Sequence, residues 1–309
     1  MGYSGGGVTD KLRGGLIGLL VGDALGVPYE FTRSYEIPGY DQIEMVPPDG
    51  FLPAHAVPPG TWSDDGSQAL CLLSSLQERG GLDTSDLACK ILAWESQGYM
   101  AVGGRVFDIG IQTKQALRRL QNGCAPEQAG GCGEADNGNG SLMRVLPLAL
   151  WHRGSDAQLV EDAMRQSSIT HGHDRSKVAC ALYCMWARLL LQEAGDLSEA
   201  VSRTMPHLTP GQLVELVRLH THQPTGYEWG SGYVLDTFAT VREALKESSY
   251  EAVVRKAISF GRDTDTTACI AGGLAGIVYG EQGIPLRWRQ TLRGQELLIP
   301  LWDNLSVNP

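Results

Sequence analysis

Two acidic segments that lie far apart in the chain carry residue types able to bind metal ions. The first reads Ser63-Asp64-Asp65, and the second runs from Asp263 to Thr266 with another aspartate at position 265. Each segment stands at the start of a run of apolar residues with helical spacing. Taken singly, each has an ordinary explanation, because carboxylates in the first turn of a helix interact favourably with the helix dipole.

The two segments together predict more than either one alone. Residues two apart in an extended loop project to the same side, so Asp263 and Asp265 can converge on one point. If Asp64 and Asp65 met them in one pocket, the four carboxylates would repel one another and each would resist ionisation. Two divalent cations would remove this conflict, and oxygen ligands without His or Cys favour Mg²⁺ or Mn²⁺ over zinc. Two such ions about 4 Å apart can orient a diol and activate a water.

Histidines near the middle of the chain have two interpretations. His171 and His173 flank a glycine before a predicted helix, which is typical of loop and capping residues. The pair His173-Asp174 also has the composition of the dyad of HD-type phosphohydrolases. That chemistry needs further histidines, and the pattern assigns no clear position to His55 or His152.

Helical periodicity dominates the elements that must position these residues. We predict a helix capped by Thr9, one capped by Ser63 that ends at Gly80, one opened by Ser85, and one beginning with Thr266 as a possible cap. Further apolar stripes predict helices over residues 177–191, 198–205, 211–219, 234–245 and 250–258. No alternating run of six residues or more predicts a strand. We therefore expect an all-α fold, with residues 9–309 as a single domain and residues 1–8 as a disordered tail.

Two irregular stretches and many glycines complete the pattern. Residues 32–62 contain six prolines, which exclude helix interiors, and a loop of this length is usually functional. The polar, glycine-rich residues 121–140 are interpreted as a binding loop rather than an interdomain linker. Several of the 39 glycines lie inside helical patterns at residues 14–22 and 272–276. Because glycine is costly in a helix, these positions predict close packing of backbones or close approach of a ligand.

Composition excludes several classes of protein. The net charge of −10 argues against binding to nucleic-acid backbones. The seven cysteines are an odd number without a CxxC pair, so we expect reduced thiols rather than a disulfide scaffold or a zinc site. The sequence has neither a signal-peptide pattern nor an apolar run long enough to span a membrane. We expect a cytoplasmic protein that is monomeric by default.

Five segments, in order, resemble the ADP-ribosylglycohydrolase family. They are GLIGLLVGDALGVPYEF at residues 15–31, WSDDGSQALCLL at residues 62–73, GNGSLMR at residues 138–144, ITHGH at residues 169–173 and FGRDTDTTACIAGGLAGIVYG at residues 260–280. The resemblance extends from about residue 10 to residue 305. It implies an orthogonal bundle of helices that holds two divalent cations, Mg²⁺ or Mn²⁺. The metal ligands implied by the resemblance are Ser63, Asp64, Asp65, Asp263, Asp265 and Thr266.

The same resemblance implies a substrate site. Glu30 is similar to an additional glutamate beside the metals, and His171 is similar to a histidine on the adenosine side. The loop at residues 131–141 resembles the segment that wraps the diphosphate and ribose, with Gly138, Asn139, Gly140 and Ser141 as candidate contacts. Backbone N–H groups of glycines can approach phosphate oxygens closely. Asp108 either caps a helix at Thr113 or contacts the leaving group, where a carboxylate would suit a guanidinium.

The implied reaction is hydrolysis of the glycosidic bond at C1 of the distal ribose in an ADP-ribose adduct, most readily ADP-ribosyl-arginine on a protein. Glu30, Asp64 and Asp263 are the candidate catalytic residues, and the transition state would resemble an oxocarbenium ion. The alternatives are a non-catalytic ADP-ribose-binding or toxin-occluding immunity protein, and a hydrolase of ADP-ribosylated nucleobase, ADP-ribosylated serine or O-acetyl-ADP-ribose.

The sequence departs from the family pattern in two places. Many members read Thr-Asp-Asp-Thr where this chain has Ser63 to Gly66, so a hydroxyl is missing at Gly66. Arg262 stands where many members have a small residue. A cation at this position either tunes metal binding or points to solvent.

Overall fold

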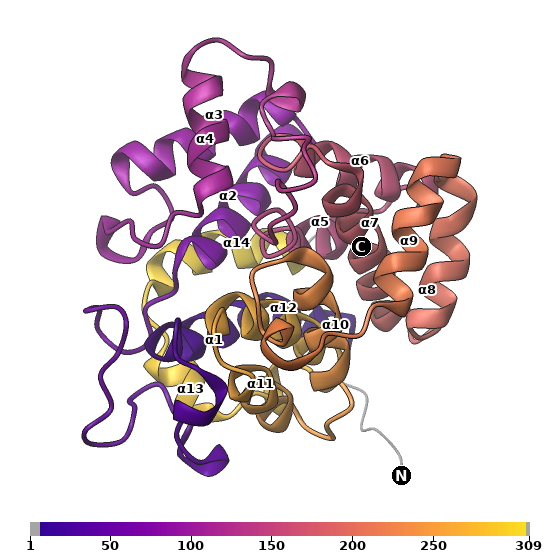
Figure 1. The fold of residues 1–309 in the computed structure, drawn as a ribbon. Helices are drawn as coiled ribbons and strands as arrows, with labels where there is room; N and C mark the ends of the chain where they lie inside the picture. Colours follow the sequence, from indigo (N-terminus) through magenta and orange to yellow (C-terminus); the bar gives the residue numbers. More distant parts are fainter. Residues whose placement is uncertain (1–6, 307–309) are drawn as a thin grey trace.

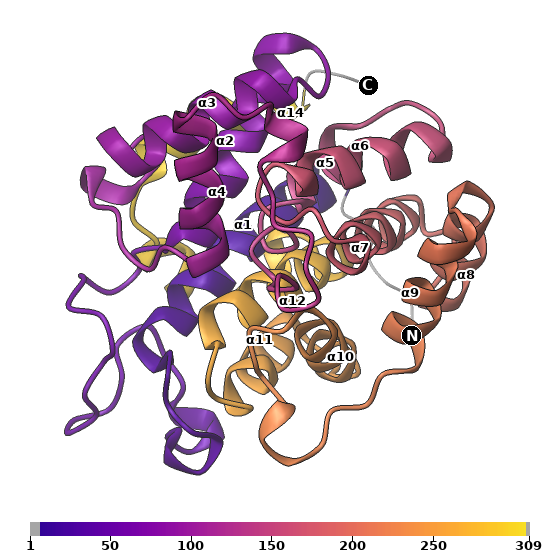
Figure 2. The same ribbon diagram turned by 45° about the horizontal axis from the view of Figure 1, so that its top comes forward.

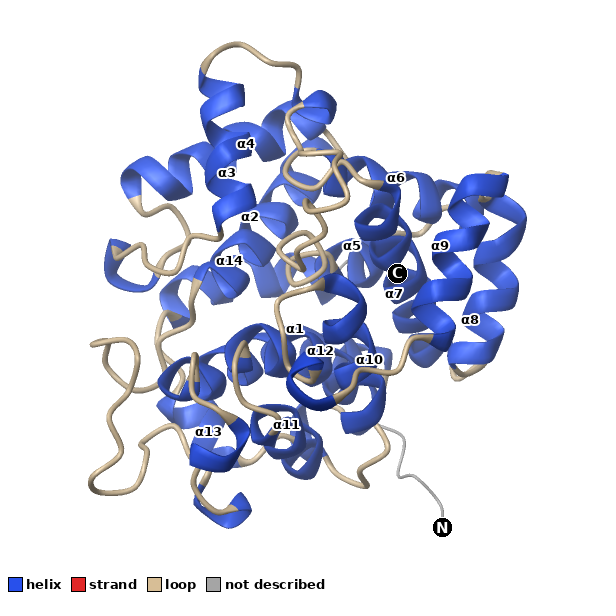
Figure 3. Cartoon of the chain, in the orientation of Figure 1, coloured by secondary structure: helices blue, strands red, loops and turns tan. Residues whose placement is uncertain are grey.

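Helices build all the regular structure between residues 7 and 306, the part of the chain described by the computed structural model (Figure 3). Only isolated bridges and no strands occur there, so the predicted all-α fold is confirmed. The α-helices are α1 (Val8–Gly26), α2 (Asp64–Arg79), α3 (Thr84–Gln97), α4 (Ile111–Gln121), α5 (Leu146–Trp151), α6 (Asp156–Ser168), α7 (Asp174–Gln192), α8 (Leu197–Thr204), α9 (Pro210–Thr221), α10 (Val234–Ala244), α11 (Tyr250–Ser259), α12 (Thr264–Tyr279), α13 (Leu286–Thr291) and α14 (Gln295–Ser306).

The helices surround a central pair, α1 and α12. Figure 1 and Figure 2 both show this pair inside the molecule, with α2, α3 and α4 grouped on one side and α8 and α9 as an outer pair on another. Of the 19 residues of α1, 14 are buried. Because α1 and α12 are enclosed by the other helices, both are apolar around most of their circumference.

Glycines allow the backbones of α1 and α12 to touch. A Cβ atom at Gly14 would lie 2.1 Å from the carbonyl oxygen of Gly276, and one at Gly276 would lie 1.9 Å from that of Gly14. At the other end of α1, a Cβ atom at Gly26 would lie 2.4 Å from the Cα atom of Asp265. The close packing predicted from the glycine pattern is therefore confirmed. It places the end of α1 against the beginning of α12.

The first helix begins earlier than predicted. Gly7 is its N-cap residue and Val8 its first residue, so the prediction that Thr9 caps this helix is wrong. The carbonyl of Gly7 already accepts hydrogen bonds from the N–H groups of Asp10 and Lys11. The predicted disordered tail, residues 1–8, lies outside the described residues except for Gly7 and Val8. These two belong to the cap and the first turn of α1.

Local capping decides the beginnings of three other helices. Ser63 caps α2 as predicted, and Gly80 ends that helix with a left-handed φ of 69°. Helix α3 is capped by Asp83 rather than opened by Ser85, because the Asp83 carboxylate accepts the N–H groups of residues 85 and 86. Helix α12 begins at Thr264 after the cap residue Asp263, so the prediction of Thr266 as the cap is wrong.

Both irregular stretches contribute residues to the wall of one large cavity. Residues 32–62 contain only the 3₁₀ turns Ser34–Glu36 and Tyr40–Gln42, in agreement with the proline content. Residues 121–140 contain the 3₁₀ turn Pro126–Gln128 and then enter the wall of the main cavity.

All seven cysteines are free. Among residues 7–306, no helix combines the length and the apolar character needed to cross a bilayer.

The contact between α1 and α12 can be tested by Gly276→Ala. The new methyl group would overlap the Gly14 carbonyl, so we expect a loss of about 2–3 kcal/mol in the free energy of unfolding. For a chain of this size, this corresponds to a melting temperature lower by about 3–5 °C. The control is Gly211→Ala in α9, where a Cβ atom meets nothing within 4 Å. Equal melting temperatures for the two variants would contradict the assigned contact.

Candidate active site

A cavity of about 1000 Å³ opens where α2, α12 and the loop before α5 meet. It is larger than three other cavities among residues 7–306, which measure about 830, 390 and 330 Å³. The walls bring together ten of the residues predicted from the sequence to form a site. These are Glu30, Asp64, Asp65, Asp108, Gly138, Asn139, Gly140, His171, Asp263 and Thr266.

Two helix N-termini supply the acidic floor of the cavity. Asp64 and Asp65 are the first two residues of α2, and Asp263 precedes α12. The hydroxyl of Thr266 lies 3.4 Å from Oδ1 of Asp65 and joins the two helix ends. The positive ends of both helix dipoles therefore face the carboxylates and partly offset their mutual repulsion. The structure thus brings together the two acidic segments that lie far apart in the sequence.

Burial strongly disfavours the charged forms of these carboxylates. Loss of hydration raises the pKa values of Asp64, Asp65 and Asp265 well above the ordinary value, and neighbouring carboxylates raise them further. The pKa of Asp263 is raised by the same loss of hydration, although the amide of Asn139 opposes this by donating a hydrogen bond of 2.7 Å to Oδ2. The cluster therefore holds negative charge only with help from cations or protons.

Two buried carboxylate oxygens are free to bind a metal ion. Oδ2 of Asp65 and Oδ2 of Asp265 have no hydrogen-bond partner among the described residues. In addition, Glu30, Asp263 and Asp265 each offer an oxygen within 4.8 Å of the others. Buried carboxylate oxygens are the donors that hard divalent cations prefer. The residues present therefore fit Mg²⁺ or Mn²⁺.

Ser63 and Asp265 lie just behind the cavity wall. The hydroxyl of Ser63 is buried and accepts the N–H group of Asp65 at 3.3 Å, so it caps α2. Asp265 is fully buried, and its Oδ1 accepts the N–H group of Thr266 at 2.9 Å. Both side chains thus orient the beginnings of the helices that carry the other candidate ligands.

Asp23 is a supporting residue that the sequence analysis did not identify. Its buried carboxylate accepts the N–H groups of Ser63 at 2.9 Å and Gly66 at 2.8 Å, so α1 holds the first turn of α2. Burial raises the pKa of Asp23 to about 7. A Cβ atom at Gly66 would lie 2.8 Å from both Leu20 and Trp62, which accounts for the missing side chain at this position. The sequence signal that could have identified Asp23 was a single acidic residue inside an apolar, glycine-rich helix.

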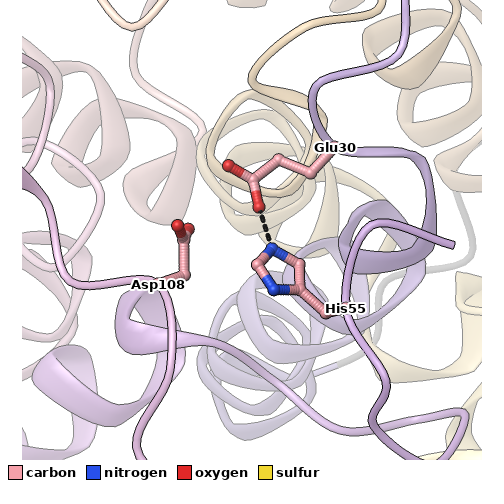
Figure 4. Close-up of side chains that lie close together, drawn as sticks. All are labelled: Glu30, His55 and Asp108. Carbon is pink, nitrogen blue, oxygen red and sulfur yellow. Dashed lines mark hydrogen bonds and ion pairs between the residues drawn. The ribbon is translucent and has the colours of Figure 1, made fainter.

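Glu30 is held by a histidine whose position the sequence left open. Figure 4 shows the Glu30 carboxylate directed at Nε2 of His55, with Asp108 facing both from another segment. Burial raises the pKa of Glu30 to about 8, and the hydrogen bond to Glu30 raises the pKa of His55. The ring of His55 lies 5.9 Å from that of Phe31 and 5.0 Å from that of Phe107. The proline-rich loop thus holds a residue of the cavity wall in place.

Asp108 does not cap a helix. Helix α4 begins after Gly110 without a side-chain cap, so the capping interpretation of Asp108 is wrong. Asp108 instead lines the cavity with a left-handed φ of 54°. Burial raises the pKa of its carboxyl group, and the nearby Asp263 raises it further. A strained, half-buried acid in a cavity wall is available to a ligand.

The glycine-rich loop packs against His171. A Cβ atom at Gly140 would lie 2.9 Å from Cε1 of His171, and one at Gly138 would lie 3.3 Å from Nε2. Burial lowers the pKa of His171 to about 3, so this imidazole is neutral at physiological pH. Ser141 behaves differently from its neighbours, because its hydroxyl is fully buried and hydrogen-bonds that of Ser167 at 2.8 Å. It lies behind the wall rather than in it.

His173 has a capping role. Its Nδ1 accepts the N–H group of Arg175 at 3.1 Å, and it is the N-cap residue of α7. Asp174 forms an ion pair with Lys177 at 2.8 Å. Neither residue belongs to a candidate metal-ligand group among residues 7–306. The capping interpretation is therefore confirmed, and nothing in this arrangement favours the HD-type dyad.

Comparison with known proteins identifies the class that has this fold and site. The sequence matches the family model described as ADP-ribosylglycohydrolase over residues 5–307. Because the match spans nearly the whole chain, this protein belongs to the ADP-ribosylglycohydrolase family.

Two relatives and one solved structure are similar to this chain over most of its length. ADP-ribosylarginine hydrolase Tri1 of Pseudomonas putida strain GB-1 is 31% identical over 283 residues, which cover 90% of this chain and 73% of the relative. ADP-ribosyl-[dinitrogen reductase] glycohydrolase of Rhodospirillum rubrum is 30% identical and covers 92% and 91%. The structure named "ADP-ribosylglycohydrolase-related protein complex" is 31% identical, with a TM-score of 0.76 and coverage of 96% and 97%.

The acidic floor leads to a stability prediction for Asp265→Asn. Without divalent cations, we expect a melting temperature equal to or above that of the unsubstituted protein, because one repelling carboxylate is removed. With millimolar Mg²⁺, we expect the unsubstituted protein to be stabilised by ligand binding and the variant to gain much less. Asp49→Asn, at an exposed aspartate, is the control. Equal stabilisation of Asp265→Asn and the control by Mg²⁺ would contradict the metal assignment.

Proposed function

We propose that this protein is a metal-dependent hydrolase that removes ADP-ribose from ADP-ribosyl-arginine on protein. The observation that carries the proposal is the convergence of two acidic helix N-termini, with unpartnered buried oxygens, on the floor of one large cavity. The names of the Pseudomonas and Rhodospirillum relatives support hydrolysis of an ADP-ribosyl bond, and the former name supports arginine as the acceptor.

The metal-binding residues of this proposal are the six predicted ones. Asp64, Asp65, Asp263 and Asp265 supply the charge, and the hydroxyls of Ser63 and Thr266 stand next to them. Two divalent cations, Mg²⁺ or Mn²⁺, supply Lewis-acid stabilisation of ribose oxygens and a nucleophile at neutral pH when bound.

The chain's own residues bind the two halves of the substrate. We assign the ADP-ribose half to the wall formed by residues 138–140 and His171, where largely buried backbone and a neutral imidazole line the cavity. We assign the guanidine of the leaving arginine to Asp108, since a carboxylate can bind a guanidinium through two hydrogen bonds. The distal ribose would then lie over the acidic floor, beside Glu30.

Hydrolysis breaks the bond between C1 of the distal ribose and the guanidine nitrogen, and the oxygen of water becomes attached to C1. A proton leaves the water and a proton reaches the departing nitrogen. We assign this proton transfer to the group formed by Glu30, Asp64 and Asp263. His55 holds the carboxylate of Glu30 in place for it.

The decisive experiment measures release of free ADP-ribose from arginine-, serine- and nucleobase-linked substrates and from O-acetyl-ADP-ribose. We expect release from the arginine adduct with Mg²⁺ or Mn²⁺ and none after treatment with EDTA. We also expect Asp64→Ala to lower the rate by at least about 100-fold, since even residues that only support metal ligands are worth 10–100-fold. The helical circular-dichroism spectrum of the variant checks that it folds.

Each other outcome has a defined meaning. Full activity after exhaustive chelation would contradict metal dependence. Release from a different adduct alone would contradict arginine as the acceptor. Binding of ADP-ribose without release from any adduct would support a non-catalytic binding or immunity protein instead.

A further inference from the structure

A second, smaller cavity adjoins the main one on the side of Asp263. It has a volume of about 390 Å³, and its walls include two arginines and four aromatic residues. Arg33 and Arg262 line both cavities, so the two spaces share one boundary. Arg262 is also one of the positions at which the sequence departs from the family pattern.

The backbone holds the two arginines side by side. The N–H group of Arg262 donates to the carbonyl of Thr32 at 2.6 Å, and the carbonyl of Arg262 accepts the N–H group of Phe31 at 2.6 Å. Arg33 forms an antiparallel bridge with Gly261. Arg262 has a left-handed φ of 68°, a conformation that is unfavourable for a residue with a long side chain. A strained residue fixed by two short hydrogen bonds is typical of a functional position.

Neither guanidinium group is neutralised by the protein. Among residues 7–306, no carboxylate forms an ion pair with Arg33 or Arg262, whereas nine of the other 17 arginines in this part of the chain have one. The guanidinium of Arg33 donates instead to the hydroxyl of Tyr35. The nearby Glu36 accepts only the backbone N–H group of Arg33, at 3.4 Å. Both positive charges are therefore available to a ligand.

Exposed aromatic rings surround the arginines. The exposed fractions of Phe31, Tyr35 and Tyr227 are 70%, 67% and 80%. Trp229 and Phe260 stack with their centroids 5.1 Å apart and complete the wall. Large apolar side chains gathered in this way on a surface are typical of a protein-binding site. Because the unpaired charges among them are positive, the complementary partner is acidic.

We propose that this cavity, lined by Arg33 and Arg262, binds an acidic segment of the ADP-ribosylated protein next to the modified arginine. The inference rests on the proposed function and names the substrate that the site prefers. The cavity meets the main one at Arg262, the residue before Asp263 of the acidic floor, where the bond to the leaving group would lie, and neither His171 nor residues 138–140 line it. A polypeptide emerging from the leaving-group side would therefore meet these arginines.

The test compares three arginine-linked substrates: ADP-ribosyl-arginine itself, an ADP-ribosylated peptide with Asp and Glu beside the arginine, and the same peptide with Asn and Gln. We expect kcat/KM for the acidic peptide to exceed that for the neutral peptide by about 5- to 10-fold at low ionic strength. The preference should shrink with added salt, because it arises from partly exposed charges.

Two substitutions at Arg262 test the charge of this residue separately from its backbone conformation. We expect Arg262→Glu to reverse the preference and Arg262→Gly, which accepts the left-handed backbone without strain, to abolish it. Lys246→Glu is the control, since it changes the net charge equally and lies in neither cavity. The readout is the ratio between the two peptides, so a general loss of activity cancels.

Two results would overturn the proposal, and a third would instead count against the proposed function. An unchanged ratio in both Arg262 variants would overturn it. An equal loss on all three substrates, with the ratio intact, would also overturn it and would assign the arginines to the ADP-ribose moiety. Failure to release ADP-ribose from any of the three substrates with the unsubstituted protein would instead be a failure of the proposed function.

Discussion

Direct contact between the backbones of α1 and α12 determines where everything else in the site lies. Because Gly14 and Gly276 leave no room for side chains between the helices, the two axes are held together along their length. The end of α1 then meets Asp265, and the carboxylate of Asp23 on the same helix binds the first turn of α2. One helix thus sets the distance between both acidic segments, and its glycines are structural requirements of the site.

The cost of this arrangement is electrostatic. Carboxylates that are brought together and deprived of water resist ionisation, and the helix dipoles of α2 and α12 offset only part of that resistance. The protein therefore holds carboxylate oxygens without hydrogen-bond partners both at the floor of its cavity, in Asp65, and just behind it, in Asp265. Such a floor favours a cationic occupant for the same reason that it destabilises the empty fold, so the proposed metal binding would be linked to stability through one cluster of charges.

The rest of the cavity differs in charge from its floor. At residues 138–140 and His171, the wall itself carries no charge, because glycine backbone, an amide and a buried, neutral imidazole form it, and Asp136 stands beside it. Toward Arg33 and Arg262, the boundary is positive and aromatic. A substrate with a nucleotide at one end and a polypeptide at the other would meet a different surface at each end. This asymmetry gives the proposed specificity a physical basis that is separate from the chemistry on the floor.

The sequence alone determined most of the helices, the two acidic motifs and the family, because apolar periodicity, caps such as Ser63 and short motifs are local signals. It did not predict α5, α6, α13 or α14. Local signals also misplaced the starts of α1, α3 and α12, where neighbouring residues compete to cap the same helix. Only the tertiary structure decided the roles of Asp23 and His55 and put the Ser141 hydroxyl behind the cavity wall. These roles depend on hydrogen bonds between distant segments, whose geometry follows from how the helices pack and is not encoded in any one stretch of the chain.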